Sequence, residues 1–391
     1  MAAFDLTSEQ RALVDLARKF AAREMRPVAA KYDREETFPE HIFREAHKLG
    51  LLNLRVPEKY GGPGLGCFEE ALVCEEFAWG CVGIGLSLIV NSLGLRPILE
   101  GASEEQKQRW LPPFGKSPRF ASFALTEPGS GSDAAGMQLR IEPDGDYYVL
   151  NGTKQFITNG DRADLVSLFG TMDPARKHKG ITALVVEKGT KGMKASKNED
   201  KMGQRASPTT QLVFEDAAVP KKNLLGREGG GWPIALATLE QTRPWIGALA
   251  VGVARAALEH SIEYTKQRRQ FGQPLINFQI TQWKIAQMAQ EIEASRLLTW
   301  KASWKVDRGE PALIFSSMAK AFATDTAMRA TTEAVQMFGG YGYVKEFPVE
   351  KLMRDAKVLQ IYEGSNEIQR LVIAETLAKA EGSGAPYLRP G

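Results

Sequence analysis

The stretch Tyr147-Tyr148-Val149-Leu150-Asn151-Gly152-Thr153-Lys154-Gln155-Phe156-Ile157-Thr158 decides the fold class of the chain. It is rich in aromatic and β-branched residues, which favour β-strands. The Asn-Gly pair in its middle is typical of the two-residue turn of a β-hairpin. The pattern therefore predicts two antiparallel strands, Tyr147 to Leu150 and Lys154 to Thr158, joined by a turn at Asn151-Gly152.

Further strand patterns follow this stretch. Leu165 to Phe169, Ile181 to Val186 and Gln211 to Phe214 are short apolar runs, separated by loops rich in Gly, Pro and Lys. No helical pattern of useful length separates them, whereas a dinucleotide-binding parallel sheet alternates strands with helices. Residues 120–233 are therefore expected to form an antiparallel β-barrel or sandwich.

Helical spacing dominates on both sides of this middle segment. From Ile234 to about Ala380, apolar residues repeat at helical spacing over long stretches with short connections, which is typical of a helical bundle. The expected fold is an α+β multidomain protein. Its domains are an N-terminal helical domain at 1–119, a middle antiparallel β-barrel at 120–233 and a C-terminal four-helix bundle at 234–391. The Gly- and Pro-rich tail 381–391 is expected to be frayed.

Composition limits the classes of function. The 391 residues include 50 basic and 47 acidic side chains, a net charge of +3, and no long basic block stands out. A nucleic-acid partner is therefore not expected. No apolar run is expected to be long enough to span a bilayer. The start of the chain, Met1-Ala2-Ala3-Phe4-Asp5, lacks a secretory signal and an Arg-rich transit peptide. A bacterial cytoplasmic location is expected, with the mitochondrial matrix as the alternative if a transit peptide was removed.

The cysteine and histidine patterns do not predict a metal centre. Cys67, Cys74 and Cys81 lie seven residues apart, which favours buried, reduced thiols on one face of a helix. The histidines, none of which has metal-ligand spacing with a second ligand, are His41, His47, His178 and His260. Metalloenzyme and hydrolase functions are therefore disfavoured.

A lone carboxylate, Glu363, lies in a short break between two helical patterns. The break reads Leu359-Gln360-Ile361-Tyr362-Glu363-Gly364-Ser365-Asn366-Glu367-Ile368-Gln369-Arg370. Gly364 suits the left-handed conformation that ends a helix, and Ser365 suits the cap of the next helix. A carboxylate held on such a turn beside apolar neighbours loses hydration, so its pKa is expected to rise toward the range of a general base. On local pattern alone, a solvated glutamate at a helix end is the alternative.

Five motifs in order resemble the acyl-CoA dehydrogenase family over nearly the whole chain. One is the break at 359–370, and the other four are Ala124-Leu125-Thr126-Glu127-Pro128-Gly129-Ser130-Gly131-Ser132-Asp133, Lys154-Gln155-Phe156-Ile157-Thr158-Asn159-Gly160, Arg268-Arg269-Gln270-Phe271-Gly272-Gln273-Pro274-Leu275 and Gln336-Met337-Phe338-Gly339-Gly340-Tyr341-Gly342. The resemblance is closest to the medium-chain, straight-chain type.

The resemblance implies an FAD enzyme that forms a double bond between the α and β carbons of an acyl-CoA thioester. Glu363 matches the family's catalytic base, which removes the α-proton while flavin N5 accepts the hydride from the β carbon. In the family, the backbone N–H of the catalytic Glu and a flavin ribityl hydroxyl stabilise the thioester oxygen. Electrons are expected to pass to an electron-transfer flavoprotein, and the expected assembly is a homotetramer.

The resemblance also implies which residues bind FAD. Phe156 matches the aromatic residue that stacks on the flavin ring, where many relatives carry Trp, and Thr158 matches a hydroxyl near N5. Arg268 and Phe271 match contacts to the pyrophosphate and adenine from a neighbouring subunit. On pattern alone, Phe156 and Thr158 would be plain strand positions and 266–269 a solvated helix end. The implied cofactor residues are Leu125, Thr126, Ser132, Phe156, Ile157, Thr158, Arg268, Phe271, Gln279, Gln336, Met337, Gly339, Gly340, Ser365 and Glu367.

Substrate contacts are implied in the same way. Some relatives carry the base at the position of Thr242, so a threonine there favours Glu363 as the only base. Trp245 is bulkier than the small aliphatic residue often found at its position, and an indole that fills a pocket removes space for longer chains. Ile89 stands where relatives with room for medium chains can carry a polar residue. The implied substrate residues are Ile89, Ser132, Glu240, Arg243, Trp245, Tyr362 and Gly364.

Several activities are compatible with this resemblance. A short- or medium-chain acyl-CoA is the expected substrate, and a branched or cyclic acyl group is the alternative. An acyl-CoA oxidase or a flavin monooxygenase on the same fold differs in how oxygen reaches the flavin. An inactive, acyl-CoA-binding partner subunit is the alternative from another class. The intact Glu363 and flavin positions argue against that last alternative.

Overall fold

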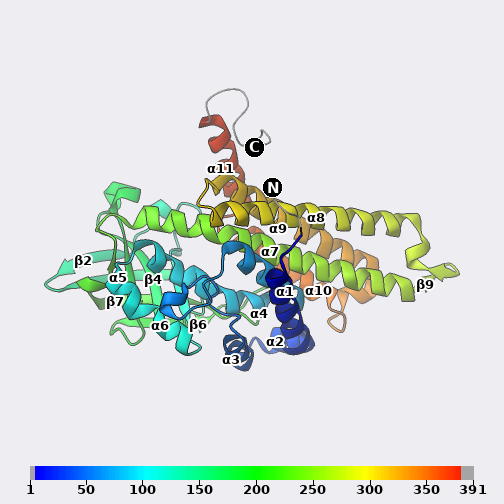
Figure 1. Cartoon of the computed structure of the whole chain (residues 1–391), viewed down its shortest axis with the longest axis horizontal. Helices are drawn as coiled ribbons and strands as arrows, with labels where there is room; N and C mark the ends of the chain where they lie inside the picture. The colour runs from blue at the N-terminus through cyan, green and yellow to red at the C-terminus, as the bar shows by residue number, and fades with distance from the viewer. Residues whose placement is uncertain (1–4, 380–391) are drawn as a thin grey trace.

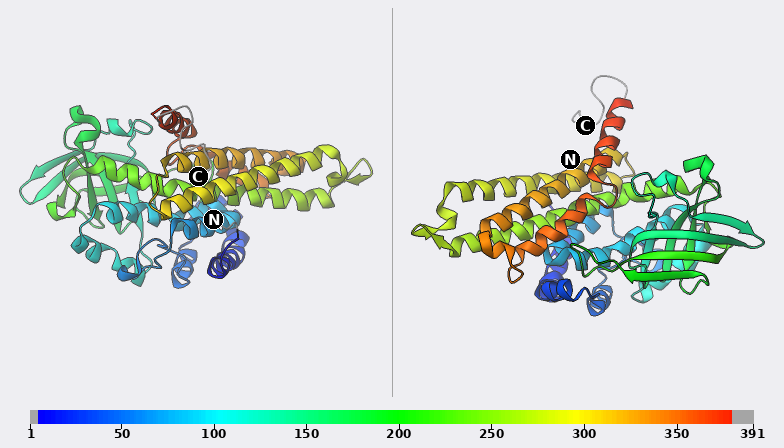
Figure 2. Two further views of the ribbon diagram at one scale, coloured as in Figure 1. Left: turned by 45° about the horizontal axis from the view of Figure 1, so that its top comes forward. Right: turned by 180° about the vertical axis from the view of Figure 1, so that it is seen from behind.

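The chain folds into a helical N-terminal part, a central β-sheet and a bundle of long helices (Figure 1). The computed structural model describes residues 5–379. The long helices follow the longest axis of the molecule, the sheet lies at one end of them, and the N-terminal helices pack along one side (Figure 2). The predicted α+β architecture is confirmed, whereas the domain boundaries stay predictions. The tail expected to be frayed, 381–391, lies outside the described residues.

Short helices surround one long helix in the N-terminal part. Capping boxes begin two of them, because the Thr7 and Ser103 hydroxyls accept hydrogen bonds from the N–H groups of Gln10 and Gln106. The helices are α1 (Ser8–Phe20), α2 (Ala29–Glu35), α3 (Glu40–Lys48), α4 (Cys67–Gly101), α5 (Glu104–Trp110) and α6 (Pro112–Lys116).

The long helix α4 contradicts the expectation that no apolar segment is long enough to span a membrane. Its 35 residues include a window of mean hydropathy 1.6, and it is the one helix of residues 5–379 that is long and apolar enough. Of that window, 89% is buried inside the protein, as in the core helix of a globular domain. Cys67, Cys74 and Cys81 are buried along α4 with free thiols. The helix bends at Cys81, where φ is −171° and ψ is 111°.

Residues 121–225, in the middle of the sequence, contain an eight-stranded sheet. Its strands are β1 (Ala121–Ala124), β2 (Arg140–Asp144), β3 (Tyr147–Thr158), β4 (Leu165–Thr171), β5 (Ile181–Glu187), β6 (Met193–Asn198), β7 (Thr209–Pro220) and β8 (Leu224–Leu225). They follow the order β6-β7-β3-β2-β4-β5-β8, with β1 also paired to β4. Most pairings are antiparallel as predicted, but β1 and one residue of β2 run parallel to β4, which the strand pattern did not indicate.

The hairpin predicted at Asn151-Gly152 is wrong. The strand β3 runs without interruption from Tyr147 to Thr158, and the turn before it contains Gly145, whose φ is 50°. At Gly152 φ is 141° and the register between β3 and β7 shifts, so this glycine forms a bulge. A Cβ there would lie 2.9 Å from Leu139 Cα. The glycine therefore permits close packing against a neighbouring segment and does not reverse the chain.

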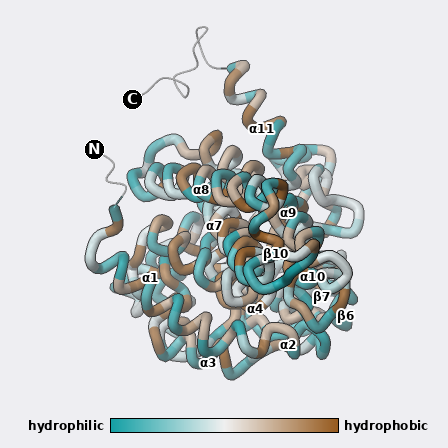
Figure 3. Tube along the Cα trace, turned by 90° about the vertical axis from the view of Figure 1, so that its right-hand side faces the viewer, coloured by the Kyte–Doolittle hydropathy of each residue, from teal (hydrophilic) through white to brown (hydrophobic). Residues whose placement is uncertain are grey.

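Long helices form the C-terminal part. They are α7 (Gly231–Gln267), α8 (Gln279–Asp307), α9 (Leu313–Phe338), α10 (Val349–Lys357) and α11 (Asn366–Lys379), with the strands β9 (Arg269–Gln270) and β10 (Gln273–Pro274) between α7 and α8. The start of α7 packs on β5, because a Cβ at Gly231 would lie 2.7 Å from the carbonyl carbon of Thr182. From there α7 runs to the far end of the bundle, where the β9–β10 hairpin faces the viewer in Figure 3.

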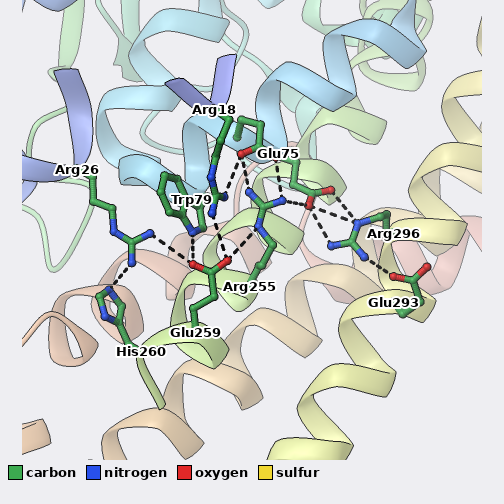
Figure 4. Close-up of polar contacts among 10 residues, drawn as sticks. Arg18, Arg26, Glu75, Trp79, Arg255, Glu259, His260, Glu293 and Arg296 are labelled. Carbon is green, nitrogen blue, oxygen red and sulfur yellow. Dashed lines mark hydrogen bonds and ion pairs between the residues drawn. The ribbon is translucent and has the colours of Figure 1, made fainter. Parts of the chain in front are cut away.

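A network of charged side chains joins the N-terminal helices to the bundle (Figure 4). The guanidinium groups of Arg18 and Arg26 lie 3.1 and 4.0 Å from the ring centroid of Trp79 on α4. The indole Nε1 of Trp79 donates to Glu259 of α7 at 2.6 Å. Arg255 of α7 binds two carboxylates of α4 at 2.7 Å. Because the carboxylates of Glu75 and Glu76 are nearly buried, removing Arg255 would leave charges that are costly to bury unpaired.

His260 is a titratable member of this network. Its Nε2 lies 2.9 Å from a guanidinium nitrogen of Arg26. Burial, followed by the charge of Arg26, lowers the pKa of His260 from 6.5 to about 4. As the pH falls, the unfolded chain therefore takes up this proton before the folded protein does. The stability associated with neutral His260 is fully present above about pH 6.5 and is lost as the pH falls toward about 4.

We predict that His260→Gln reduces the loss of stability in acid. Glutamine keeps a polar partner for Arg26 but takes up no proton. The melting temperature should rise by about 1–3 °C over wild type near pH 5 and should not rise near pH 7.5. Thermal unfolding of the intact protein across this range measures the effect. His178→Gln, which changes an exposed histidine, is the control and should follow wild type. The same pH dependence in all three proteins would contradict the prediction.

Candidate active site

The predicted break between two helices is present around Glu363. Helix α10 ends at Lys357, a 3-10 turn covers Val358–Gln360, and α11 begins at Asn366. Glu363 and Gly364 adopt left-handed backbone conformations, with φ of 58° and 87°. For a glutamate this conformation costs about 1–2 kcal/mol, so surrounding contacts must stabilise it.

The two oxygens of the Glu363 carboxyl group differ in their hydrogen bonding. Its Oε2 accepts a hydrogen bond from the hydroxyl of Thr242 on α7 at 3.0 Å. Its Oε1 is buried and has no hydrogen-bond partner within residues 5–379. Burial raises the pKa of Glu363 to about 7, although the Thr242 hydrogen bond and the charges of Arg243 and Lys320 lower it. A buried carboxylate oxygen that is free and titrates near neutrality is suited to accept a proton.

Side chains from two helices fix the main chain of this turn. The carbonyl of Glu363 accepts from Arg243 Nε at 3.4 Å and from Gln369 Nε2 at 3.3 Å. Gln369 also donates to the carbonyl of Gly364 at 3.0 Å, and a Cβ at this glycine would collide with the Gln369 amide. The sequence predicted Arg243 at this site but missed Gln369. The only signal was its place one turn into the helix that follows Glu363.

The predicted acyl-pocket residues share one apolar core. Ile89 and Trp245 are buried in it, and Tyr362 packs against it. The Tyr362 hydroxyl accepts from Gln204 Nε2 at 3.3 Å, a contact that the sequence did not suggest. Trp245 is 1% exposed, and its indole Nε1 has no hydrogen-bond partner in the described part of the chain. All three predicted residues therefore belong to one large apolar cluster, Ile89 and Trp245 inside it and Tyr362 at its boundary.

A second group of predicted residues lies on the sheet. The buried Lys154 donates to the Leu125 carbonyl and to the Glu127 carboxylate, both at 2.8 Å, and so holds the loop after β1 against β3. On β3, Phe156 is 62% exposed and has a φ of 58°. An exposed aromatic ring on a left-handed backbone is unfavourable unless a ligand covers it.

The loop 126–133 meets β3 next to Phe156, where the N–H of Gln155 donates to the Thr126 carbonyl at 2.8 Å. A Cβ added at Gly129 or Gly131 would meet no atom within 4 Å. Ser132 is exposed, and Thr158 is half-buried. An open loop with glycines and hydroxyls lets backbone amides approach a ligand closely. The arrangement fits a flat aromatic group with polar edges.

A third group of predicted residues lies at the far end of the bundle. The guanidinium carbon of Arg268 lies 5.5 Å from the ring centroid of Tyr341, which directly follows the turn 336–340. Phe271 is 93% exposed and has a φ of 50°. Figure 1 shows β9, which follows Arg268, at the opposite end of the molecule from the sheet. One chain therefore does not bring Arg268 and Phe271 to Phe156.

The remaining predicted residues have other surroundings. The Ser365 hydroxyl lies 3.5 Å from the N–H of Ile368 at the start of α11, where Glu367 is exposed. Glu240 accepts from the N–H of Ala312 at 3.2 Å, so its carboxylate lies at the start of α9. The other predicted residues differ in exposure. The exposed ones are Gln279, Gln336, Gly339 and Gly340, and the buried ones are Met337 and Ile157.

Comparison with known families identifies the class of protein. Models of the N-terminal, middle and C-terminal domains of acyl-CoA dehydrogenases match residues 7–117, 122–217 and 229–378. The chain therefore belongs to the acyl-CoA dehydrogenase family, whose members are FAD-dependent oxidoreductases.

Similar proteins cover almost the whole chain. Cyclohex-1-ene-1-carbonyl-CoA dehydrogenase of Geobacter metallireducens is 45% identical over 95% of this chain and 98% of its own. The structure of butyryl-CoA dehydrogenase from Megasphaera elsdenii is 42% identical, with a TM-score of 0.94 over 96% of this chain and 100% of its own. A chain solved in a study of the electron transferring flavoprotein of Acidaminococcus fermentans is 41% identical, with the same TM-score and coverage.

The residues on the sheet fit the flavin of this family. The exposed face of Phe156 suits a flat aromatic ring. The open loop at Gly129 and Gly131 gives the polar edge of that ring access to backbone groups. Within residues 5–379, no group of three His, Cys, Asp or Glu side chains is arranged to hold a metal ion.

We predict that Phe156→Gly stabilises the flavin-free protein but weakens flavin binding. Glycine tolerates the left-handed backbone, which should add about 0.5–1 kcal/mol to the free energy of unfolding. Loss of the ring contact should weaken FAD binding by about fivefold or more. Unfolding of the flavin-free protein and FAD titration measure the two effects. Phe156→Trp keeps both the aromatic face and the strained backbone, so it should change neither. FAD affinity at the wild-type level in Phe156→Gly would contradict the prediction.

Proposed function

We propose that this protein oxidises an acyl-CoA thioester between its α and β carbons, and that Glu363 removes the α-proton. The observation that carries the proposal is Glu363 Oε1, a buried carboxylate oxygen without a partner in the described part of the chain. A general base is most effective when its pKa lies near the working pH, and burial raises the pKa of Glu363 to about 7. Because position 242 is a threonine, it cannot supply an alternative base.

The residues around the turn orient this base. Arg243 and Gln369 bind the carbonyl of Glu363, and Thr242 binds one of its carboxylate oxygens. The other oxygen stays free for the substrate. The backbone N–H of Glu363 is the proposed donor that stabilises the thioester oxygen as negative charge develops on it. The contacts to the main chain thus position Glu363 without using its Oε1, the oxygen proposed to accept the proton.

Residues on the sheet would hold the flavin. Phe156 would lie against the ring, while Thr158 and the loop at Thr126 would bind its polar edge. Ser132 is exposed on the same loop and would contact the pantetheine arm of CoA. When bound, FAD supplies the acceptor for the hydride that leaves the β carbon of the substrate.

A short acyl-CoA is the substrate class with the best support. One similar solved protein is a butyryl-CoA dehydrogenase, and the bulky Trp245 is buried in the core that Ile89 and Tyr362 share. A large side chain in an acyl pocket excludes longer chains through overlap. A cyclic acyl group is the second candidate, because a relative at 45% identity acts on cyclohex-1-ene-1-carbonyl-CoA by its name.

The cofactor site is proposed to be completed by a second copy of the chain within a homotetramer. Within one chain, the β9–β10 hairpin, which follows Arg268 and has Phe271 in its loop, lies at the opposite end of the molecule from the sheet that carries Phe156. On α8, Ile280 and Trp283 are 63% and 62% exposed, and large exposed apolar groups mark interfaces. Light scattering should show a tetramer that loses FAD on dissociation. A monomer that keeps stoichiometric FAD would contradict this assembly.

An electron-transfer flavoprotein is the proposed electron acceptor. Its support is the family and the similar chain from a study of such a flavoprotein. An acyl-CoA oxidase on the same fold is the alternative, and it would form peroxide in air at the rate of acyl-CoA oxidation. An inactive acyl-CoA-binding subunit would not reduce its flavin at all. The cytoplasmic location stays a prediction.

We predict that Glu363→Gln keeps FAD and binds butyryl-CoA but reduces its flavin about 10²–10⁴-fold more slowly, because the amide cannot accept the α-proton. Anaerobic stopped-flow absorbance measures the rate. In the wild-type enzyme, kcat/KM should rise with pH through about 7, as Glu363 loses its proton. Glu375→Gln, which changes an exposed carboxylate on α11, should follow wild type. Reduction at the wild-type rate in Glu363→Gln would exclude this glutamate as the base.

We predict that Trp245→Val increases kcat/KM for longer acyl chains relative to butyryl-CoA. Each additional methylene that the pocket accommodates should add about 0.8 kcal/mol of burial, or about fourfold. A series of straight-chain acyl-CoA substrates measures the profile. Trp110→Val removes another buried indole, in a different apolar cluster, and should cost stability without changing the profile. An unchanged profile in both variants would leave Trp245 with a packing role only.

A further inference from the structure

A buried lysine lies behind the turn that carries Glu363. Lys320 of α9 is fully buried, and its Nζ donates to the Gly364 carbonyl at 2.8 Å and to Asn366 Oδ1 at 2.9 Å. Burying an ammonium group against neutral acceptors is costly, and an apolar side chain of the same length would avoid that cost. A charge at this place therefore calls for a role beyond packing.

The same helix binds the turn on both sides. Asp325, five residues after Lys320, accepts from Gln360 Nε2 at 2.6 Å and from Asn366 Nδ2 at 2.7 Å through one oxygen. Gln360 precedes the turn and Asn366 follows it. Lys320 binds Gly364, which lies between them. Helix α9 therefore contacts the segment around Glu363 at three residues.

We propose that Lys320 is a positioning residue for the reaction: its ammonium group holds the Gly364 carbonyl and Asn366 so that Glu363 keeps its left-handed backbone and its carboxylate stays beside Thr242. This inference rests on the proposed role of Glu363 as the base. Because Glu363 is strained at a φ of 58°, it needs external contacts to keep this conformation. Lys320 binds the neighbouring Gly364 carbonyl and not the Glu363 carboxylate, whose Oε2 is bound by Thr242.

The charge of Lys320 also acts on the base. Burial lowers the pKa of Lys320 to about 7, and its charge in turn lowers the pKa of Glu363. The other charged groups that act on Lys320 are Arg243 on α7, Asp325 on α9 and Glu367 on α11. Removing the ammonium group should therefore raise the pKa of Glu363. A lysine that only fills space would not affect this value.

Lys320→Met tests the proposal, because methionine keeps the length and apolar bulk of the side chain. With butyryl-CoA as the probe, the limiting rate of anaerobic flavin reduction per bound FAD should fall about 10–100-fold. The concentration of butyryl-CoA at half-saturation should stay within about twofold. The pH midpoint of the limiting rate should move upward. Lys305→Met removes a lysine that pairs with Glu310 at the end of α8 and should leave all three values unchanged.

The outcomes separate this inference from the proposed function. If Glu363→Gln abolishes flavin reduction while Lys320→Met keeps both the wild-type rate per FAD and the wild-type pH midpoint, the positioning role is wrong. If Glu363→Gln reduces its flavin at the wild-type rate, the proposed role of Glu363 as the base is wrong, whatever Lys320→Met shows. Lys320→Gln, which keeps a shorter neutral donor, replaces Lys320→Met if the latter does not assemble with FAD. It should show the same upward shift of the pH midpoint, and an unchanged midpoint would overturn the proposal.

Discussion

The close packing of α4 against α7 is the contact on which the rest of the structure depends. At Gly252 of α7, a Cβ would collide with the Glu75 carbonyl of α4, so only glycine allows the two backbones to approach this closely. The same helix α7 carries Thr242 and Arg243 to the turn at Glu363. A larger residue at 252 would push α7 away from α4, and the partners of the base would move with it.

At the turn, the side chains that hold Glu363 in place contact main-chain carbonyls more than the carboxylate that is proposed to take the proton. Arg243 is cationic and its charge lowers the pKa of Glu363, yet its Nε binds the main-chain carbonyl of Glu363. A direct ion pair with the carboxylate would favour its charged form and lower its basicity. Because the strong contacts go to backbone oxygens, burial remains the largest influence on the pKa of Glu363. These contacts would thus hold the proposed base in place and still leave it basic enough to take a proton.

Local features could be predicted from the sequence, and features that depend on distant contacts could not. The turn at Glu363 follows from Gly364 and the helical spacing on either side, which are local. The Asn151-Gly152 pair forms a bulge because Leu139 packs closely on Gly152, and no local pattern records that approach. Lys320 was missed for the same reason, since its acceptor on Gly364 lies 44 residues away in the sequence. Hydropathy alone likewise does not distinguish the buried α4 from a membrane span.

The length of α7 supports the proposal that a second chain completes the cofactor site. Its 37 residues rise about 55 Å from Gly231 on the sheet to the bundle end at Arg268. The β9–β10 hairpin, whose loop contains Phe271, and the sheet that carries Phe156 lie at opposite ends of the molecule. The exposed Phe271 and the exposed Phe156 each carry a left-handed backbone, a cost that is hard to explain without a ligand at both ends. If a second copy brings its bundle end to the sheet of the first, one cofactor covers both rings, and assembly and flavin retention become the same equilibrium.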